Sequence, residues 1–153
     1  MNEQTTLDDA TRRELLHRAR NAARHAYVPY SEFPVGAALL TGDGTIVTGS
    51  NIENASYGLT CCAERSAVFT AASAGHREIV AVAVSAPRSP RTTPCGACRQ
   101  VLNEFRPSSG DMVVILDDRA EGEAVPLEAL LPKAFGPRNF ADSGAAPPHS
   151  HAG

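Results

Sequence analysis

The chain has 153 residues, of which 42% are hydrophobic, and its formal net charge at pH 7 is -3. This length favours one domain, which we place at residues 1–137, and the apolar fraction argues against wholesale disorder. Because the net charge is negative and no Lys/Arg run is visible, a built-in attraction to phosphate backbones is excluded, and no nucleic-acid partner is expected.

The start of the chain is polar and acidic, unlike a secretory signal with its basic start and apolar centre. The longest apolar run, Ile79 to Val84, is too short to span a bilayer. We therefore expect a cytoplasmic protein without a membrane partner. In that setting the clustering of the 4 cysteines indicates metal binding or catalysis in preference to disulfides.

The first predicted element is an amphipathic helix from about Asp8 to Tyr27, where apolar residues recur at helical spacing with arginines between them. Prolines at 29 and 34 cannot continue it. Val35–Leu40 and Thr45–Gly49 are then predicted to form a hairpin, because the glycines of Thr41–Gly44 suit a tight turn. Residues 50–59 show no period and are predicted to be a loop.

Helices and strands alternate in the rest of the chain. The predicted helices are Cys62–Ala74, Cys95–Phe105 and Leu127–Leu131, and the predicted buried strands are Ile79–Ser85 and Met112–Leu116. From Arg138 onward we expect a disordered tail. Because a hairpin is antiparallel, these elements predict a mixed sheet covered by helices on both faces.

Two cysteine motifs carry the chemistry. Cys95 and Cys98 form a CxxC pair at a predicted helix start, where exposed N–H groups and the helix dipole favour thiolates. Alone, this pair fits a metal site and a redox site equally well. Cys62, at a second predicted helix start, supplies a third thiolate and favours metal. Three protein ligands leave a tetrahedral zinc ion one open position, as in catalytic sites.

Several neighbouring residues have alternative interpretations. Glu64 lies two residues beyond Cys62, where a carboxylate can reach the open position without binding the metal; the alternative is a good helix former in a first turn, and the three thiolates favour the functional interpretation. Cys61 would make the site structural as a fourth ligand, but adjacent cysteines chelate one ion poorly, and we interpret it as a small buried apolar residue. The 5 histidines are expected to be exposed to solvent. Asp117 and Asp118 are interpreted as a solvated turn.

Cys62-Ala63-Glu64-Arg65, followed by Pro94-Cys95-Gly96-Ala97-Cys98-Arg99-Gln100, resembles the cytidine/deoxycytidylate deaminase family, whose zinc enzymes carry His-x-Glu and Pro-Cys-x-x-Cys. Cys62 stands where that signature has histidine, which resembles the small all-cysteine branch. The resemblance runs from about Tyr27 to Pro137. It also includes Pro29-Tyr30-Ser31, Phe33–Ala38, Asn51–Asn54, Leu130–Pro132 and Phe135–Pro137.

The resemblance implies a three-layer α/β/α sandwich with a central mixed five-stranded sheet. It implies one Zn²⁺ per subunit, held by Cys62, Cys95 and Cys98, with Glu64 as the general acid and base. It also implies a homotetramer with shared active sites. The further implied roles are Asn51 and Glu53 on the ribose 3′-hydroxyl, Phe33 on the pyrimidine ring, the N–H of Ala63 on the base, Arg65 on the zinc thiolates, and Tyr57 and Phe135 in a neighbouring subunit's site.

The implied activity is hydrolytic deamination of free cytidine and deoxycytidine in pyrimidine salvage. Three alternatives are weighed: a deaminase of another aminated nucleoside such as blasticidin, a base-editing enzyme that acts on RNA or DNA, and a structural zinc module without catalysis. The net acidity and the lack of an aromatic-basic stripe argue against the second. The intact Asn51–Asn54 loop favours a nucleoside with a free ribose. A structural module would leave Glu64 and this loop without a role.

Overall fold

The computed structural model describes residues 7–141 and 144. Its centre is a five-stranded sheet in the order β2-β1-β3-β4-β5. The strands are β1 (Gly36–Thr41), β2 (Ile46–Ser50), β3 (Ile79–Ser85), β4 (Val113–Leu116) and β5 (Glu123–Pro126). Strands β3 and β4 run parallel, and every other neighbouring pair is antiparallel. The prediction of a mixed sheet is therefore confirmed.

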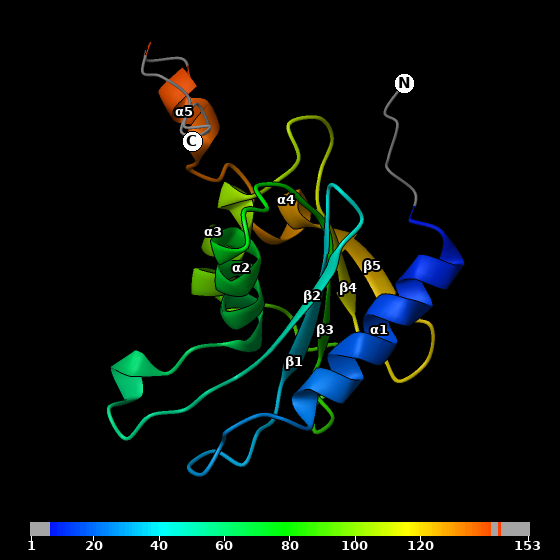
Figure 1. The fold of residues 1–153 in the computed structure, drawn as a ribbon, viewed down its shortest axis with the longest axis vertical. Helices are drawn as coiled ribbons and strands as arrows, with labels where there is room; N and C mark the ends of the chain where they lie inside the picture. Colours follow the sequence, from blue (N-terminus) through cyan, green and yellow to red (C-terminus); the bar gives the residue numbers. More distant parts are fainter. Residues whose placement is uncertain (1–6, 142–143, 145–153) are drawn as a thin grey trace.

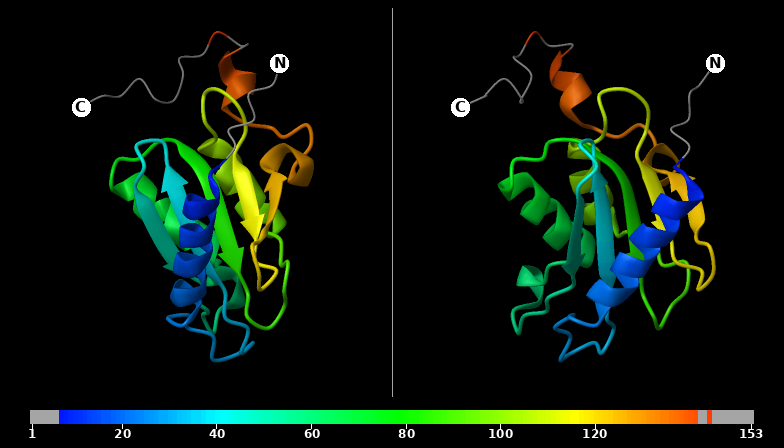
Figure 2. Two further views of the ribbon diagram at one scale, coloured as in Figure 1. Left: turned by 90° about the vertical axis from the view of Figure 1, so that its right-hand side faces the viewer. Right: turned by 45° about the vertical axis from the view of Figure 1, so that its right-hand side comes forward.

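Helices cover both faces of this sheet (Figure 1). They are α1 (Asp9–Ala23), α2 (Ala63–Ser73), α3 (Gly96–Glu104), α4 (Leu127–Leu130) and α5 (Pro137–Ala141), and a 3-10 turn spans Tyr57–Leu59. Helix α1 packs on one face, and α2 and α3 pack on the other (Figure 2). This arrangement confirms the three-layer α/β/α sandwich.

Each face of the sheet has its own hydrophobic core. On the α1 face, Leu15 and Leu16 are buried against Ala83 and Ile115 of the sheet. The other core is larger, because α2, α3 and α4 all contribute to it. Its buried members include Leu39, Ala67, Val68, Ile79, Val82, Leu102, Met112, Val114 and Leu127. Burial of these side chains is the main stabilising contribution to the fold.

Two glycines allow helices to approach the sheet closely. A Cβ atom added at Gly36 would lie 2.1 Å from the carbonyl oxygen of Ala19 in α1. A Cβ atom at Gly49 would lie 2.5 Å from the backbone nitrogen of Ala67 in α2. Any side chain at either position would push a helix off the sheet. At Gly49 that displaced helix would be the one that begins next to Cys62.

Helix α1 ends earlier than the predicted limit at Tyr27. Asp8 caps its start, accepting a hydrogen bond from the N–H of Thr11 at 2.8 Å. Tyr27 instead forms a β-bridge with Ile52, and the N–H of Tyr27 donates to the carbonyl of Asn51 at 3.0 Å. The correction has a tertiary cause: this bridge draws the chain out of the helical path before the first proline is reached.

Three further predictions need correction or completion. The hydrophobic pattern of the sequence did not predict β5, because its four residues are mostly exposed. Asp117 is not part of a solvated turn, because it is 8% exposed and accepts hydrogen bonds from Arg20 at 2.7 and 2.9 Å. Residues 138–141 of the expected disordered tail belong to α5, and the rest of that tail, Gly144 apart, lies outside the described residues.

Within residues 7–141, every helix falls short of the length and apolar character that crossing a lipid bilayer requires.

Candidate active site

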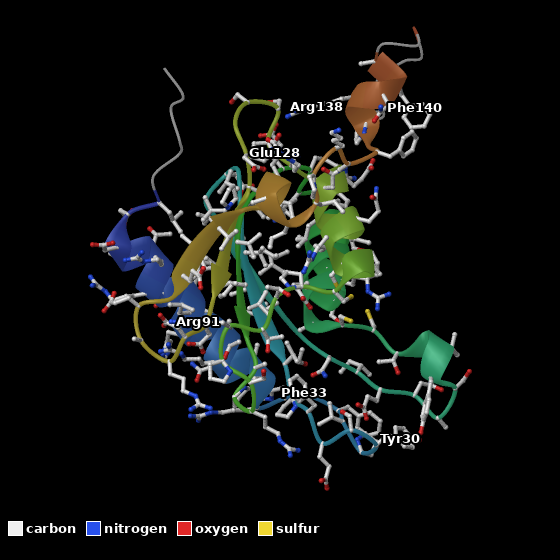
Figure 3. All side chains as sticks on the ribbon, turned by 180° about the vertical axis from the view of Figure 1, so that it is seen from behind. Tyr30, Phe33, Arg91, Glu128, Arg138 and Phe140 are labelled. Atoms are coloured by element: carbon white, nitrogen blue, oxygen red, sulfur yellow. The ribbon has the colours of Figure 1, made fainter. Side chains whose placement is uncertain are left out.

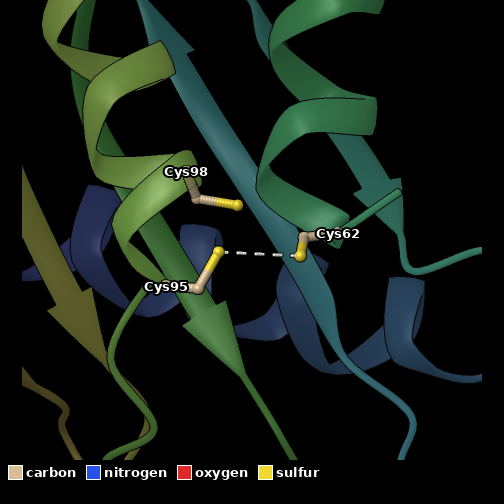
Figure 4. A group of neighbouring side chains, drawn as sticks. All are labelled: Cys62, Cys95 and Cys98. Atoms are coloured by element: carbon tan, nitrogen blue, oxygen red, sulfur yellow. Dashed lines mark hydrogen bonds between the residues drawn. The ribbon is translucent and has the colours of Figure 1, made fainter. Parts of the chain in front are cut away.

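The three predicted metal ligands meet between the N-terminal ends of α2 and α3 (Figure 4). Cys62 is the N-cap residue of α2, Cys95 is the N-cap residue of α3, and Cys98 is a buried residue in the first turn of α3. Neither cap residue uses its side chain to bond the helix. The sulfurs therefore face one another, with the positive ends of two helix dipoles directed at them.

The spacing of the sulfurs fits zinc. A tetrahedral zinc ion with Zn–S bonds of about 2.3 Å sets its sulfurs roughly 3.8 Å apart. The Sγ atoms of Cys62 and Cys95 are 3.8 Å apart, and all three Sγ atoms lie within 4.8 Å of one another. Thiolate donors in this number favour zinc over magnesium or calcium.

No fourth ligand joins this group among the residues that the structure describes. Cys61 belongs to a different contact set, in which its Sγ accepts from the hydroxyl of Ser66 at 3.6 Å. Glu64 also stays outside the group of mutually close ligand atoms. The donor set is thus that of a three-ligand site, which is the open type used in catalysis.

The surroundings favour the thiolate at Cys62 and the neutral thiol at Cys98. A hydrogen bond from Cys98, aided by Arg65, lowers the pKa of Cys62 to about 5 against the effect of burial. The pKa of Cys98 is raised by its hydrogen bond with Cys62 and by burial. Arg65 donates from Nη2 to the Cys62 Sγ at 3.4 Å and to the carbonyl of Thr60 at 3.3 Å. A divalent cation would offset the negative charge that these sulfurs concentrate.

Glu64 lies in the first turn of α2 and is 4% exposed. Burial raises the pKa of its carboxyl group to about 7, and the charge of Cys62 acts in the same direction. The carboxyl group also interacts with the Cys98 thiol, so it lies beside the cluster. A buried carboxyl group with this pKa can both accept and donate a proton near neutral pH.

A β-bridge brings the Asn51–Asn54 loop next to the cysteines. Ile52 and Cys61 exchange both backbone hydrogen bonds, each at 2.9 Å. Asn51 then reaches across to a second loop: its Oδ1 accepts from the N–H of Val35 at 2.8 Å, and its Nδ2 donates to the carbonyl of Phe33 at 2.9 Å. One side chain thus fixes the backbone on both sides of Pro34.

Glu53 binds the same second loop, residues 28–34, which we call the 28–34 loop. Its Oε2 accepts from the N–H groups of Tyr30 at 2.8 Å and Ser31 at 3.2 Å, and its Oε1 accepts from the hydroxyl of Ser31. The hydrogen bond from the Ser31 hydroxyl is the main cause of the lowered pKa of Glu53. The carboxylate is therefore ionised and fixed in direction.

Phe33 is half-buried on the 28–34 loop, at the opposite end of the molecule from α5 (Figure 3). Its N–H donates to the hydroxyl of Ser31 at 3.1 Å. Ala63 is buried at the first position of α2, where an N–H group has no partner within its helix. The structure thus brings Phe33, Asn51 and Glu53 into one hydrogen-bonded unit, and the Ile52–Cys61 bridge links this unit to the segment that leads into Cys62.

Tyr57 contacts the 28–34 loop only through an exposed ring, and the ring of Phe135 packs against Phe140 near the end of the described chain. Tyr57 is 74% exposed and contacts the ring of Tyr30 edge-on, at 5.8 Å between centroids. Phe135 is 62% exposed and contacts Phe140 in the same way, at 5.6 Å.

Sequence reasoning gave no role to Arg88 or Arg99. Arg88 donates from Nη1 to the carbonyl of Glu32 at 2.7 Å, which ties the chain after β3 to the 28–34 loop. Arg99 binds three acceptors around the start of α3. Arg99 stands inside the Pro94–Gln100 motif, so its position was a signal. No sequence signal marked Arg88, because its partner is the backbone carbonyl of Glu32, which is far away in the sequence.

Comparisons with known proteins agree with this geometry. The family model for the cytidine and deoxycytidylate deaminase zinc-binding region matches residues 9–115. The chain is 50% identical over 125 residues to a cytidine deaminase of Halalkalibacterium halodurans, which covers 81% of this chain and 93% of the relative.

Solved structures show the same likeness. The crystal structure of cytidine deaminase from Burkholderia pseudomallei has a TM-score of 0.74 and 44% identity, covering 80% of this chain and 98% of that one. The crystal structure of cytidine deaminase from Mycobacterium tuberculosis has a TM-score of 0.71 and 44% identity, covering 81% of this chain and 96% of that one.

Proposed function

Since the chain belongs to the cytidine and deoxycytidylate deaminase family, we propose that it catalyses the zinc-dependent hydrolytic deamination of cytidine and deoxycytidine. The products are uridine or deoxyuridine and ammonia. One observation carries the proposal: the buried Glu64 carboxyl group lies beside three sulfurs whose spacing fits zinc.

Cys62, Cys95 and Cys98 hold the zinc ion in this proposal. When bound, zinc activates a water molecule as the nucleophile for attack at C4 of the pyrimidine. Three thiolates make the ion a weaker Lewis acid, because they bring more negative charge than the ion neutralises. Arg65 and the two helix N-termini counter this effect by withdrawing charge from the sulfurs.

Glu64 moves the protons. It takes one from the attacking water and delivers it to N3 of the ring as the C4–O bond forms. It then takes the second proton from that oxygen and delivers it to the exocyclic amino group, which leaves as ammonia when the C4–N bond breaks. Burial raises the pKa of a carboxyl group, and this favours a group that must donate protons as well as accept them near neutral pH.

Asn51 and Glu53 keep hydrogen-bonding capacity for a sugar. A carboxylate has about four acceptor sites, and the 28–34 loop uses three of those of Glu53. The remaining site can accept from the ribose 3′-hydroxyl, and the second N–H of the Asn51 amide can donate to the same oxygen. Phe33 packs on the pyrimidine ring, and the N–H of Ala63 contacts the base.

We further propose that residues 1–137 form one catalytic domain in the cytoplasm and that four copies share their active sites. The exposure of Tyr57 and Phe135 supports this assembly, since each would become buried on entering a neighbouring copy's site. Substitution of Tyr57 by alanine would then lower activity without altering the zinc content.

The test is to mix the purified protein with cytidine and deoxycytidine and to follow ammonia release and product formation. Parallel samples are treated with a zinc chelator and then resupplied with zinc. We expect turnover of both nucleosides, loss on chelation and recovery with zinc. Absence of turnover by zinc-loaded protein would refute the proposal.

A substrate panel separates this function from the nearest rival. Blasticidin carries an aminated pyrimidine without a free ribose, so it cannot satisfy Asn51 and Glu53 as ribose does. We expect cytidine to be deaminated with the higher kcat/KM. Preference for blasticidin would assign the chain to the other class of nucleoside.

A further inference from the structure

The outward face of α3 binds a segment from the end of the chain. Arg99 donates from Nη1 to the carbonyl of Leu130 at 2.8 Å. The next residue, Gln100, and Asn103 about one turn further along both donate to the carbonyl of Phe135, at 2.9 and 3.1 Å. We call residues 130–136 the C-terminal strap.

The strap fits closely against α3. Asn103 is 7% exposed, and a Cβ atom added at Gly136 would lie 2.5 Å from its Nδ2 atom. Leu127, one turn before the strap in α4, is fully buried in the larger core. The strap is therefore anchored at its start by hydrophobic packing and along its length by side-chain amides and a guanidinium.

Arg99 also holds the chain immediately before the first α3 cysteine. Its Nε donates to the carbonyl of Pro94 at 2.7 Å, and its Nη2 donates to the hydroxyl of Thr93 at 3.0 Å. Its backbone N–H donates to the carbonyl of Cys95 at 2.9 Å, which closes the first turn of the helix. One residue thus fixes the direction in which the chain enters Cys95.

From these contacts we infer that Arg99 is a positioning residue for the metal centre, which fastens the Cys95 end of α3 to the C-terminal strap. The inference rests on the proposed zinc site. Without the guanidinium, the approach to Cys95 and the strap lose their common anchor. Partners that orient metal ligands in this way typically contribute about 10- to 100-fold to metal affinity.

The test compares zinc-loaded wild type with Arg99→Met and Arg99→Lys in a chelator chase that measures zinc affinity and release rate. Methionine keeps much of the apolar stem and removes all donors, whereas lysine keeps the charge and serves fewer acceptors. We expect zinc affinity to fall about 10- to 100-fold for Arg99→Met, with Arg99→Lys intermediate. Arg77→Met is the matched control, because Arg77 also bonds two carbonyls, those of Ala72 and His76, away from the cysteines.

A second readout separates positioning from a general loss of stability. Thiol alkylation of the zinc-loaded proteins, mapped by mass spectrometry, should accelerate at Cys95 more than at Cys62 in the Arg99 variants. Arg77→Met should keep the wild-type zinc affinity and alkylation pattern. If Arg99→Met does not fold, the zinc affinity and alkylation pattern of Arg99→Lys test the inference.

Wild-type zinc affinity in folded Arg99→Lys, or equal acceleration at Cys95 and Cys62, would overturn the inference. Failure of the wild type itself to hold zinc would instead refute the proposed function.

Discussion

Cys62 and Cys95 each stand at the N-cap of a helix, whereas Phe33 stands on a loop without regular structure. The cysteines proposed to bind zinc take their direction from local helix geometry, which two short motifs encode. The 28–34 loop takes its shape from distant side chains, with Asn51 and Glu53 on one side and Arg88 on the other.

This difference separates the residues proposed to catalyse the reaction from those proposed to bind the nucleoside. The residues proposed to hold zinc and move protons lie in the first turns of α2 and α3 or at their N-caps, and Glu64 and Cys98 among them are buried, so regular backbone structure limits their movement. The residues proposed to bind the nucleoside depend on long-range hydrogen bonds. Changes in the first region should therefore abolish turnover, and changes in the second should mainly weaken substrate binding.

The largest expected effect is that of Glu64→Gln. The amide fills the same space but cannot carry a proton, so kcat for cytidine should fall about 10²- to 10⁴-fold while zinc content stays at the wild-type value. Steady-state kinetics and metal analysis of the same preparation measure both. Residual activity within ~10-fold of wild type would remove Glu64 from the proton-transfer role.

Glu53→Ala should act mainly through binding. Loss of a hydrogen bond to a charged group typically costs about 1.5–3 kcal/mol, so kcat/KM for cytidine should fall about 10- to 100-fold with zinc retained. The loss should be smaller with 3′-deoxycytidine, which lacks the hydroxyl in question. Ser31→Ala is the control, because it removes a loop contact of Glu53 and leaves the carboxylate. An equal loss in Ser31→Ala would mean that Glu53 acts only by holding the loop.

Arg88→Ala should weaken substrate binding less than Glu53→Ala, because it also acts on the 28–34 loop but removes only one contact. Glu32 has a φ of 54°, which is unfavourable for a residue with a side chain, and Arg88 donates to its carbonyl. We expect KM for cytidine to rise about 3- to 10-fold with kcat little changed. Adding Glu32→Asn, which tolerates this conformation, should recover part of the loss. An unchanged KM in Arg88→Ala would show that the loop holds its shape without this contact.

Asp117→Asn should change stability and leave both regions alone. Burial opposes ionisation of Asp117, yet hydrogen bonds from Arg20 and Ser85 hold its pKa below the usual 3.8. A carboxylate with a lowered pKa stabilises the fold above the unfolded pKa and loses that contribution as pH falls through the folded pKa. The free energy of unfolding in urea should fall by about 1–2 kcal/mol at pH 7. The difference from wild type should shrink in acid, and a change in KM would contradict this scaffold role.

The elements of the fold that could be predicted from the sequence are those that local patterns encode, and the ones that were missed depend on distant contacts. The continuous apolar run of Ile79–Val84, rich in β-branched residues, marked β3 with its observed limits, and the glycine-containing turn after β1 marked the hairpin. Strand β5 escaped notice because Glu123–Pro126 is short, mostly exposed and ends in proline. The early end of α1 depends on a bridge between Tyr27 and Ile52, which no local pattern contains.

The candidate site shows the same contrast between features that local sequence encodes and features that depend on distant contacts. Cys62, Glu64, Cys95 and Cys98 were identified from spacing within two short segments, and the structure brings them together. The network around Glu53 was not predicted, because a carboxylate binding backbone N–H groups of another loop leaves no periodic signal in the sequence. Arg99 contacts Leu130, which only the folded topology brings within reach of α3.

The central claim is that three thiolates hold zinc beside a carboxylate that is not a ligand. X-ray absorption at the zinc edge, on wild type and Glu64→Gln, tests it most directly. We predict three sulfurs and one light atom around zinc in both proteins. Four sulfurs, which would bring in Cys61, or a light-atom shell that changes in Glu64→Gln, would contradict the account.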